Sequence, residues 1–199
     1  MSSDGEKYSL DSAEALHDFA AAHNLSEIVN FHNVVRACLS EKASEFADDV
    51  VVKSALENYT DYLATATFLM VYSYFEEDLY LLWKWKAKNV QRGKEKSIKR
   101  YQPVLAWLGF DLGHSSWQFM LEATDIRHSL LHANGRLDHN PNRQRLDSIV
   151  AKYPGELSVM HSRLRVTAEF LSRILEQVRS FQDETKRVGL AQESQNSSE

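Results

Sequence analysis

Apolar residues recur three and four positions apart along almost the whole chain, and no other feature of the sequence constrains its fold as strongly. Residues at this spacing form one stripe on an α-helix, which another helix can cover. Only seven glycines and three prolines interrupt the pattern over 199 residues, a length that suits one domain. We therefore predict an all-α fold, with one helical domain over residues 10–188 and disordered polar tails over residues 1–9 and 189–199.

Helix caps and breaks divide this pattern into separate helices. The expected helices cover about residues 11–23, 26–46, 51–89, 97–108, 116–133 and 168–188, with one helical turn near 146–151 inside a polar loop. In the third helix the apolar stripe shifts by one position after Met70, so we expect one long bent helix, or a change of neighbour there. Ser115 or Ser116 is the expected N-cap of the fifth helix, and Thr167 is that of the last.

Positive charge is concentrated in one segment of an acidic chain. The formal net charge is −5, but positions 84–100 contain eight basic residues and one glutamate, so this segment is +7 and the remainder is −12. Trp85 and Tyr101 lie among these charges and could stack on unpaired bases. Two interpretations stay open: a solvated helix end, and a surface that binds RNA. The RNA-binding residues would be Lys84, Lys86, Lys88, Arg92, Lys94, Lys96, Lys99 and Arg100.

Three features of the sequence bear on its compartment. The single cysteine, Cys38, has no partner for an internal disulfide, which is typical of a reducing cytoplasm. The first residues, MSSDGEKYSLDS, lack the apolar core of a secretion signal. The most apolar window, residues 64–75, is shorter than the roughly 20 residues that span a bilayer. We expect a soluble, cytoplasmic protein without a membrane partner.

The stretch Ile126–Leu137, IRHSLLHANGRL, holds one arginine, two histidines and a helix stop. On a helix that turns about 100° per residue, Arg127 falls inside the apolar arc. His128 and His132 lie four residues apart, where that arc meets the polar face. The Asn134–Gly135 pair suits the left-handed backbone that ends a helix. We therefore expect the motif at the C-terminal end of a helix, facing a cleft that another helix must close.

Structural roles for these residues stay open beside a chemical one. Arg127 could lay its aliphatic stem over apolar neighbours, or pair with a buried carboxylate such as Asp78 of the third helix. Glu122, Asp125 and Ser129 fall on the polar face, where solvated side chains are expected. The two histidines could bind Zn²⁺, but HSLLH lacks the glutamate of HExxH, and no third ligand is obvious. We expect no metal and no cofactor.

This stretch resembles the signature of the HEPN superfamily (higher eukaryotes and prokaryotes nucleotide-binding). In that signature an arginine, a polar residue, three further residues and a histidine close a helix, as Arg127, His128 and His132 do here. An N-G-R turn follows in many members, and residues 134–136 have that sequence. The segment YFEEDLYLL, residues 74–82, is also similar to the mid-domain helix of such proteins.

The resemblance implies a helical bundle of the HEPN type and a homodimer in which two copies of the motif face each other. Many members are metal-independent endoribonucleases that act as toxins or in defence against phage, whereas others are inactive or only bind nucleotides. The catalytic residues carried over are Arg127, His132 and His128, with Asn134 in support. An antitoxin or another regulatory protein would be a further partner. One toxin subfamily has a modifiable tyrosine where this chain has Asn134, so that form of regulation is not expected.

The residue types of the motif suit cleavage of RNA without a metal. Such cleavage needs activation of the ribose 2′-OH, stabilisation of charge at phosphorus, and protonation of the leaving 5′-oxygen. Histidine can act as a base or an acid near neutral pH, and arginine offers a fixed fork of donors to phosphate oxygens. A twofold dimer would add a second copy of each group. The alternative is a non-catalytic HEPN-like module that binds a protein or a nucleotide.

Overall fold

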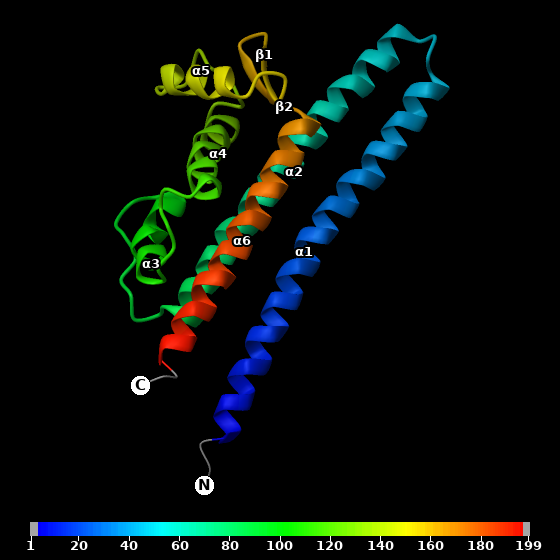
Figure 1. Cartoon of the computed structure of the whole chain (residues 1–199). Coiled ribbons are helices and arrows are strands. Elements are labelled where there is room, and N and C mark those ends of the chain that lie inside the picture. The colour runs from blue at the N-terminus through cyan, green and yellow to red at the C-terminus, as the bar shows by residue number, and fades with distance from the viewer. Residues whose placement is uncertain (1–3, 197–199) are drawn as a thin grey trace.

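Two long antiparallel helices, α1 (Asp4–Glu45) and α2 (Val50–Lys86), form the longest dimension of a mostly helical molecule (Figure 1). The computed structural model describes residues 4–196, with side chains over residues 23–189. In Figure 1, α1 lies along one side of α2, and the shorter elements gather on the other side. The predicted all-helical class is confirmed at this coarse level.

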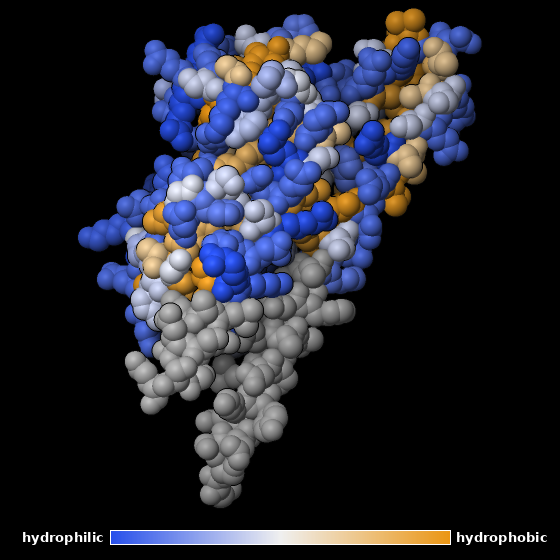
Figure 2. Space-filling view, viewed as in Figure 1, coloured by the Kyte–Doolittle hydropathy of each residue, from blue (hydrophilic) through white to orange (hydrophobic). Residues whose placement is uncertain are grey.

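The turn between α1 and α2 is fixed by an N-cap. Asp49 Oδ1 accepts hydrogen bonds from the backbone N–H groups of Val51 and Val52, both at 3.0 Å, which satisfies donors that a helix start leaves open. Val50 and Val51 are nevertheless 79% and 80% exposed. Figure 2 shows apolar side chains at this tip of the hairpin. The hairpin therefore projects beyond the core.

The two helices predicted for residues 11–23 and 26–46 are one continuous helix, α1. Leu25, between the two predicted ranges, is only 6% exposed and belongs to the core. Further along α1, His32 Nδ1 lies 2.9 Å from Thr67 Oγ1, and this contact joins α1 to α2. The prediction was wrong because burial of Leu25 outweighs the weak helix-breaking tendency of Asn24.

A third long helix, α6 (Ala168–Asn196), packs along α2. Thr167 caps it, since Phe170 N donates to Thr167 Oγ1 at 3.4 Å, as predicted. The face expected to be buried is buried, and its members are Phe170, Ile174, Val178 and Phe181. Residues 4–9 and 189–196 are helical in α1 and α6, where disordered tails were predicted. No proline interrupts either end, so the helices continue.

Short helices connect α2 to α6. They are η1 (Ser97–Tyr101), α3 (Gln102–Trp107), α4 (Ser115–His132) and α5 (Arg143–Lys152). The first two match the helix predicted for 97–108, whereas α5 is longer than the single turn predicted near 146–151. The cap of α4 is His114 rather than a serine, because His114 Nδ1 accepts from Ser116 N at 3.4 Å.

A small antiparallel hairpin, β1 (Leu157–Met160) and β2 (Arg163–Val166), follows α5, in a region where no strand was predicted. His161 and Ser162 form its turn with φ values of 50° and 60°, as two-residue hairpins require. Leu137 N donates to Ser162 O at 2.9 Å. The chain that leaves α4 is therefore fastened to this hairpin.

The neighbours of α2 change along its length, while the helix itself is unbroken across Met70. Asp61 near its start pairs with Arg165 of β2. Further on, Tyr72 bonds to Thr124 of α4, and the ring of Phe75 packs edge-on against Phe181 of α6 at 4.9 Å. Over the described residues, no helix has the length and apolar character needed to cross a bilayer.

Candidate functional site

The motif lies at the C-terminal end of α4, as predicted. Ile126 is fully buried and fixes that helix against the core. The N–H groups of Ala133 and Gly135 both donate to Ser129 O at 3.0 Å, and Asn134 and Gly135 have φ values of 48° and 71°. A Cβ at Gly135 would lie 3.0 Å from Leu164 O of β2. Close approach of the hairpin therefore explains the glycine that ends the motif.

Arg127 reaches across to α2, which forms the far wall expected from the sequence. Its Nη2 lies 3.4 Å from Glu76 Oε2, and its Cζ lies 5.0 Å from the centroid of the Tyr72 ring. The Arg127 and Glu76 side chains are 28% and 23% exposed. An ion pair and a cation–π contact thus hold the guanidinium at the edge of the core, within reach of solvent.

Asp78 was one candidate partner of Arg127, and the observed partner is Glu76. Two residues correspond to about 200° around a helix, so Asp78 points to another side of α2. There its Oδ2 accepts a hydrogen bond from Gln182 Nε2 of α6 at 3.1 Å. Sequence reasoning missed Glu76 because the carboxylate that faces Arg127 depends on how α2 and α4 cross.

Tyr72 is the platform on which Arg127 lies. Its ring is fully buried, and its OH lies 2.7 Å from Thr124 Oγ1. Thr124 Oγ1 itself donates to Met120 O at 3.0 Å, so the Tyr72 hydroxyl is the donor of the pair. Burial raises the pKa of Tyr72. The phenol therefore stays neutral and positions the arginine without taking part in proton transfer near neutral pH.

The two histidines of the motif are exposed neighbours. The ring centroids of His128 and His132 lie 4.5 Å apart, with the ring planes inclined at 48°. On the wheel of α4, Leu131 and His128 lie between Arg127 on one flank and His132 on the other. Leu131 is 48% exposed. These four side chains therefore form one sector at the C-terminal end of α4, in which His128, Leu131 and His132 are exposed and Arg127 is half-buried against α2.

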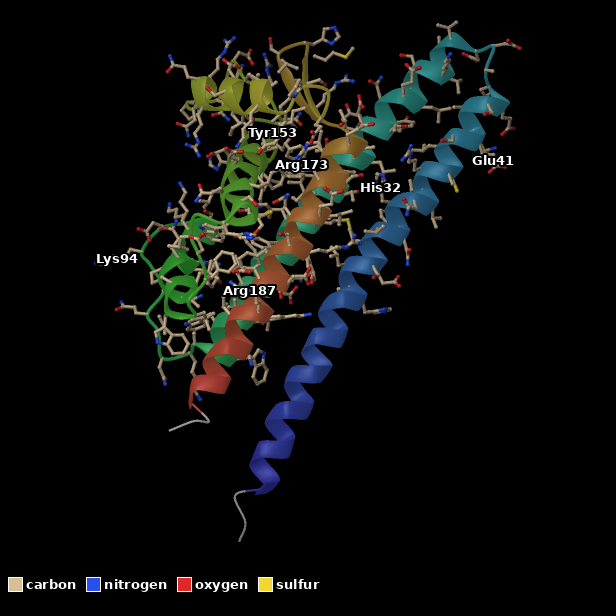
Figure 3. All side chains as sticks on the ribbon, viewed as in Figure 1. His32, Glu41, Lys94, Tyr153, Arg173 and Arg187 are labelled. Atoms are coloured by element: carbon tan, nitrogen blue, oxygen red, sulfur yellow. The ribbon has the colours of Figure 1, made fainter. Side chains whose placement is uncertain are left out.

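The carboxylates expected to be solvated on α4 instead hold α5. Glu122 accepts hydrogen bonds from Lys152 Nζ at 2.8 Å and from Tyr153 OH at 2.6 Å. Asp125 pairs with Arg145. Figure 3 shows Tyr153 directed into the junction of α4, α5 and α6. The partners of Glu122 and Asp125 thus tie them to a structural role.

Ser129 was also expected to be solvated, but it is buried. The sequence places this residue on the polar face of α4, but it is fully buried, and its hydroxyl has no hydrogen-bond partner among the described residues. The β1–β2 hairpin and the chain that leaves α4 cover that side of the helix. The polar face predicted from the wheel is therefore narrower in the structure.

The basic segment divides into two groups of side chains. Arg92 Cζ lies 4.1 Å from the Trp83 ring centroid, and Arg100 Cζ lies 5.0 Å from that of Tyr101. The segment's lysines are exposed, and Figure 3 shows Lys94 at the outer edge of the molecule. The lysines on the C-terminal turn of α2 are Lys84 and Lys86, and the others are Lys88, Lys94, Lys96 and Lys99. The two arginines thus lie over the rings of Trp83 and Tyr101, whereas Lys84 Nζ lies 5.5 Å from the ring centroid of Trp85, which is itself exposed.

The described residues contain no candidate metal site, and comparison with known proteins gives no match. Among the residues with described side chains, no group of three histidines, cysteines, aspartates or glutamates is placed to hold a metal ion. Comparison of the chain with protein-family models, with curated proteins and with solved structures gives no match. The function proposed below is therefore argued from the site itself.

Proposed function

We propose that this chain is a metal-independent endoribonuclease of the HEPN type. The observation that carries the proposal is the sector at the C-terminal end of α4, where Arg127 is held by Tyr72 and Glu76 of α2 and the rings of His128 and His132 are exposed. The site lies between α4 and α2, and both helices pack into the core. Such a position suits a site that must hold its groups in place.

In the proposed reaction, a histidine of the sector takes the proton of the ribose 2′-OH. The 2′-oxygen then attacks phosphorus, the bond from phosphorus to the 5′-oxygen breaks, and the leaving oxygen receives a proton from an imidazolium. Arg127 donates hydrogen bonds to the phosphate oxygens, on which negative charge increases. His132 is the proposed acid–base group, and His128 contacts the phosphate. The products are a 2′,3′-cyclic phosphate and a 5′-hydroxyl.

The proposed active form is a homodimer that joins two copies of this sector. Exposed apolar side chains lie in and near the motif: Leu131 is 48% exposed, and Tyr80, one turn beyond Glu76 on α2, is 40% exposed. Burial of such side chains between two copies would stabilise an isologous contact. Leu131→Asp should shift the molecular mass in light scattering from dimer to monomer, and a monomeric wild type at micromolar concentration would contradict the dimer.

The HEPN resemblance also implies a biological setting, which belongs to the same proposal: a role as a toxin or in phage defence, an antitoxin partner and a cytoplasmic location.

The second candidate is a non-catalytic binding module with this fold. One observation favours it: the charge of Arg127 is already matched by Glu76 at 3.4 Å. A protein or nucleotide would then bind the sector without reaction.

One experiment separates the two candidates. Purified protein is incubated with total RNA and tRNA in EDTA, beside Arg127→Ala and His132→Ala. Arg143→Ala and His139→Ala are the matched controls, since these side chains are 63% and 61% exposed and lie outside the motif. Cleavage by wild type and controls alone supports the ribonuclease. Equal cleavage by all five proteins, or none from folded wild type, rejects it.

A further inference from the structure

A cleft of about 530 Å³ lies between the C-terminal end of α2 and η1. Its walls are Trp83 of α2, residues 88–93 and Glu95 of the connecting loop, and Arg100 of η1. Three basic side chains of this lining face a single glutamate. The cleft is therefore open, polar and positive, which suits an anionic ligand.

Two arginines of the cleft are held by aromatic rings rather than by carboxylates. Arg92 Cζ lies 4.1 Å from the Trp83 ring centroid, and the guanidinium groups of Arg92 and Arg100 both lie within 6.0 Å of the Tyr101 ring centroid. Neither arginine forms an ion pair with any side chain that the structure describes. Glu95 lies in the same lining, but no described carboxylate is within ion-pair distance of either guanidinium group.

One polar atom of the Arg100 side chain, the buried Nε, has no hydrogen-bond partner among the described residues. A buried N–H group of a cation without an acceptor costs free energy, and such groups in folded proteins are nearly always satisfied. Because Nε is closed to solvent, a phosphate in the cleft would be bound by the Nη groups of Arg100, since guanidinium groups bind phosphate through a fixed fork of donors.

Backbone contacts hold the loop that forms the cleft. Gly93 N donates to Arg100 O at 2.7 Å, and Trp83 Nε1 donates to Val90 O at 3.0 Å. Ser97, at the end of the loop, has a φ of 65°, a strained value for a residue other than glycine. Arg92 thus belongs to a loop that is fastened to α2 and η1, and Arg100 belongs to η1 itself, so the fold positions both arginines.

The cleft lies on the same face of α2 as the contact with Arg127. Glu76 and Trp83 are seven residues apart, which is nearly two turns and about 10 Å along the helix. Tyr80 lies between them, 40% exposed, with its ring centroid 5.8 Å from that of Trp83. A single strand could therefore pass from one arginine site to the other over an aromatic ring.

We propose that the cleft binds a phosphate group of the RNA strand that the Arg127 motif cleaves, and that the strand passes over Tyr80 between the two sites. The identity of the strand rests on the proposed function, but binding in the cleft does not require cleavage. A mononucleotide offers the same phosphate chemistry, so the test must separate the two sources.

Fluorescence anisotropy measures binding of a single-stranded RNA oligonucleotide whose 2′-O-methyl groups prevent cleavage. The variant Arg92→Gln/Arg100→Gln is compared with Lys94→Gln/Lys96→Gln, which removes the same charge from exposed positions outside the lining. The arginine variant should lose about tenfold or more in affinity and lower the salt slope by about two. The lysine variant should lose about twofold. Thermal unfolding checks each protein, and Arg92→Gln alone serves if the double variant is unfolded.

Equal losses of affinity in the two variants would overturn the proposal that the cleft binds a phosphate, because charge alone would then explain RNA binding. Wild type that does not bind the oligonucleotide would overturn it as well. AMP that displaces the oligonucleotide at concentrations near the oligonucleotide's own Kd would assign the cleft to a mononucleotide and overturn the strand path. Arg127→Ala should retain most of the oligonucleotide affinity, so loss of cleavage in that variant does not bear on the cleft.

Discussion

Arg127 and the Arg92–Arg100 pair lie against one face of α2, about two helical turns apart, and they differ in how their charge is balanced. All three guanidinium groups lie over aromatic rings. Arg127 also faces Glu76 at 3.4 Å, whereas the pair has no carboxylate partner in the described part of the chain. A balanced arginine adds little to the attraction of RNA, while an unbalanced pair adds much. We infer that Arg127 acts on the reaction and that the pair acts on affinity.

Arg127→Ala should have the largest effect on cleavage. Loss of a donor to the phosphate oxygens at the transition state lowers kcat by about 10²–10³-fold, with KM nearly unchanged. Steady-state cleavage of a fluorogenic RNA in EDTA measures both constants, and Arg143→Ala is the control. An increase in KM at constant kcat would show that Arg127 only binds RNA, and the contrast between the two regions would fail.

Arg92→Gln/Arg100→Gln should change KM rather than kcat, the opposite of Arg127→Ala. We expect KM to rise by about tenfold at low salt while kcat stays near the wild-type value, because these arginines bind the substrate equally in ground and transition states. The difference should shrink as salt is raised. A fall in kcat comparable to that of Arg127→Ala would mean that the cleft belongs to the reaction centre.

Gly135→Ala should destabilise the turn after α4 and leave the Arg92–Arg100 pair unaffected. The new Cβ would lie 3.0 Å from Leu164 O at a φ of 71°, so the free energy of unfolding should fall by more than about 1 kcal/mol. Urea unfolding measures the change. Gly155→Ala is the matched control, since Gly155 has a φ of 81° but no atom within 4 Å of its Cβ position. Equal losses would show that strain alone, without the contact to β2, explains the glycine.

Glu76→Gln should have the smallest effect. Partly exposed ion pairs contribute about 0–1 kcal/mol, so thermal stability should change little. The freed guanidinium should bind the 2′-O-methyl oligonucleotide slightly more tightly, while kcat falls severalfold because Arg127 loses an orienting partner. An unchanged kcat would show that Tyr72 alone positions the arginine.

The sequence predicted elements whose signals are local. The helix over residues 97–108, the cap at Thr167 and the stop at Asn134–Gly135 all follow from cap chemistry and apolar spacing, and all are confirmed. The break predicted near Leu25 is absent, because that residue packs into the core. The β1–β2 hairpin was missed because its strands have four residues each and a polar turn, so that long-range pairing decides them.

The candidate site was predictable in part for the same reason. Its position at the end of α4, the pairing of His128 with His132, and an arginine that leaves the polar face can all be read from helical spacing. Glu76, in contrast, faces Arg127 only through the crossing of α2 and α4, which spacing within one helix does not determine. The separate behaviour of the arginines and lysines between positions 84 and 100 likewise depends on tertiary contacts with Trp83 and Tyr101.

The central claim is that the Arg127 and His132 motif cleaves RNA by attack of the 2′-oxygen without a metal. The most direct measurement is the chemistry of the product ends after incubation of a defined RNA with wild-type protein in EDTA, by mass spectrometry. The account predicts 2′,3′-cyclic phosphate and 5′-hydroxyl ends, and their absence with Arg127→Ala and His132→Ala. Products with 3′-hydroxyl and 5′-phosphate ends, or intact RNA in the presence of folded dimer, would contradict it.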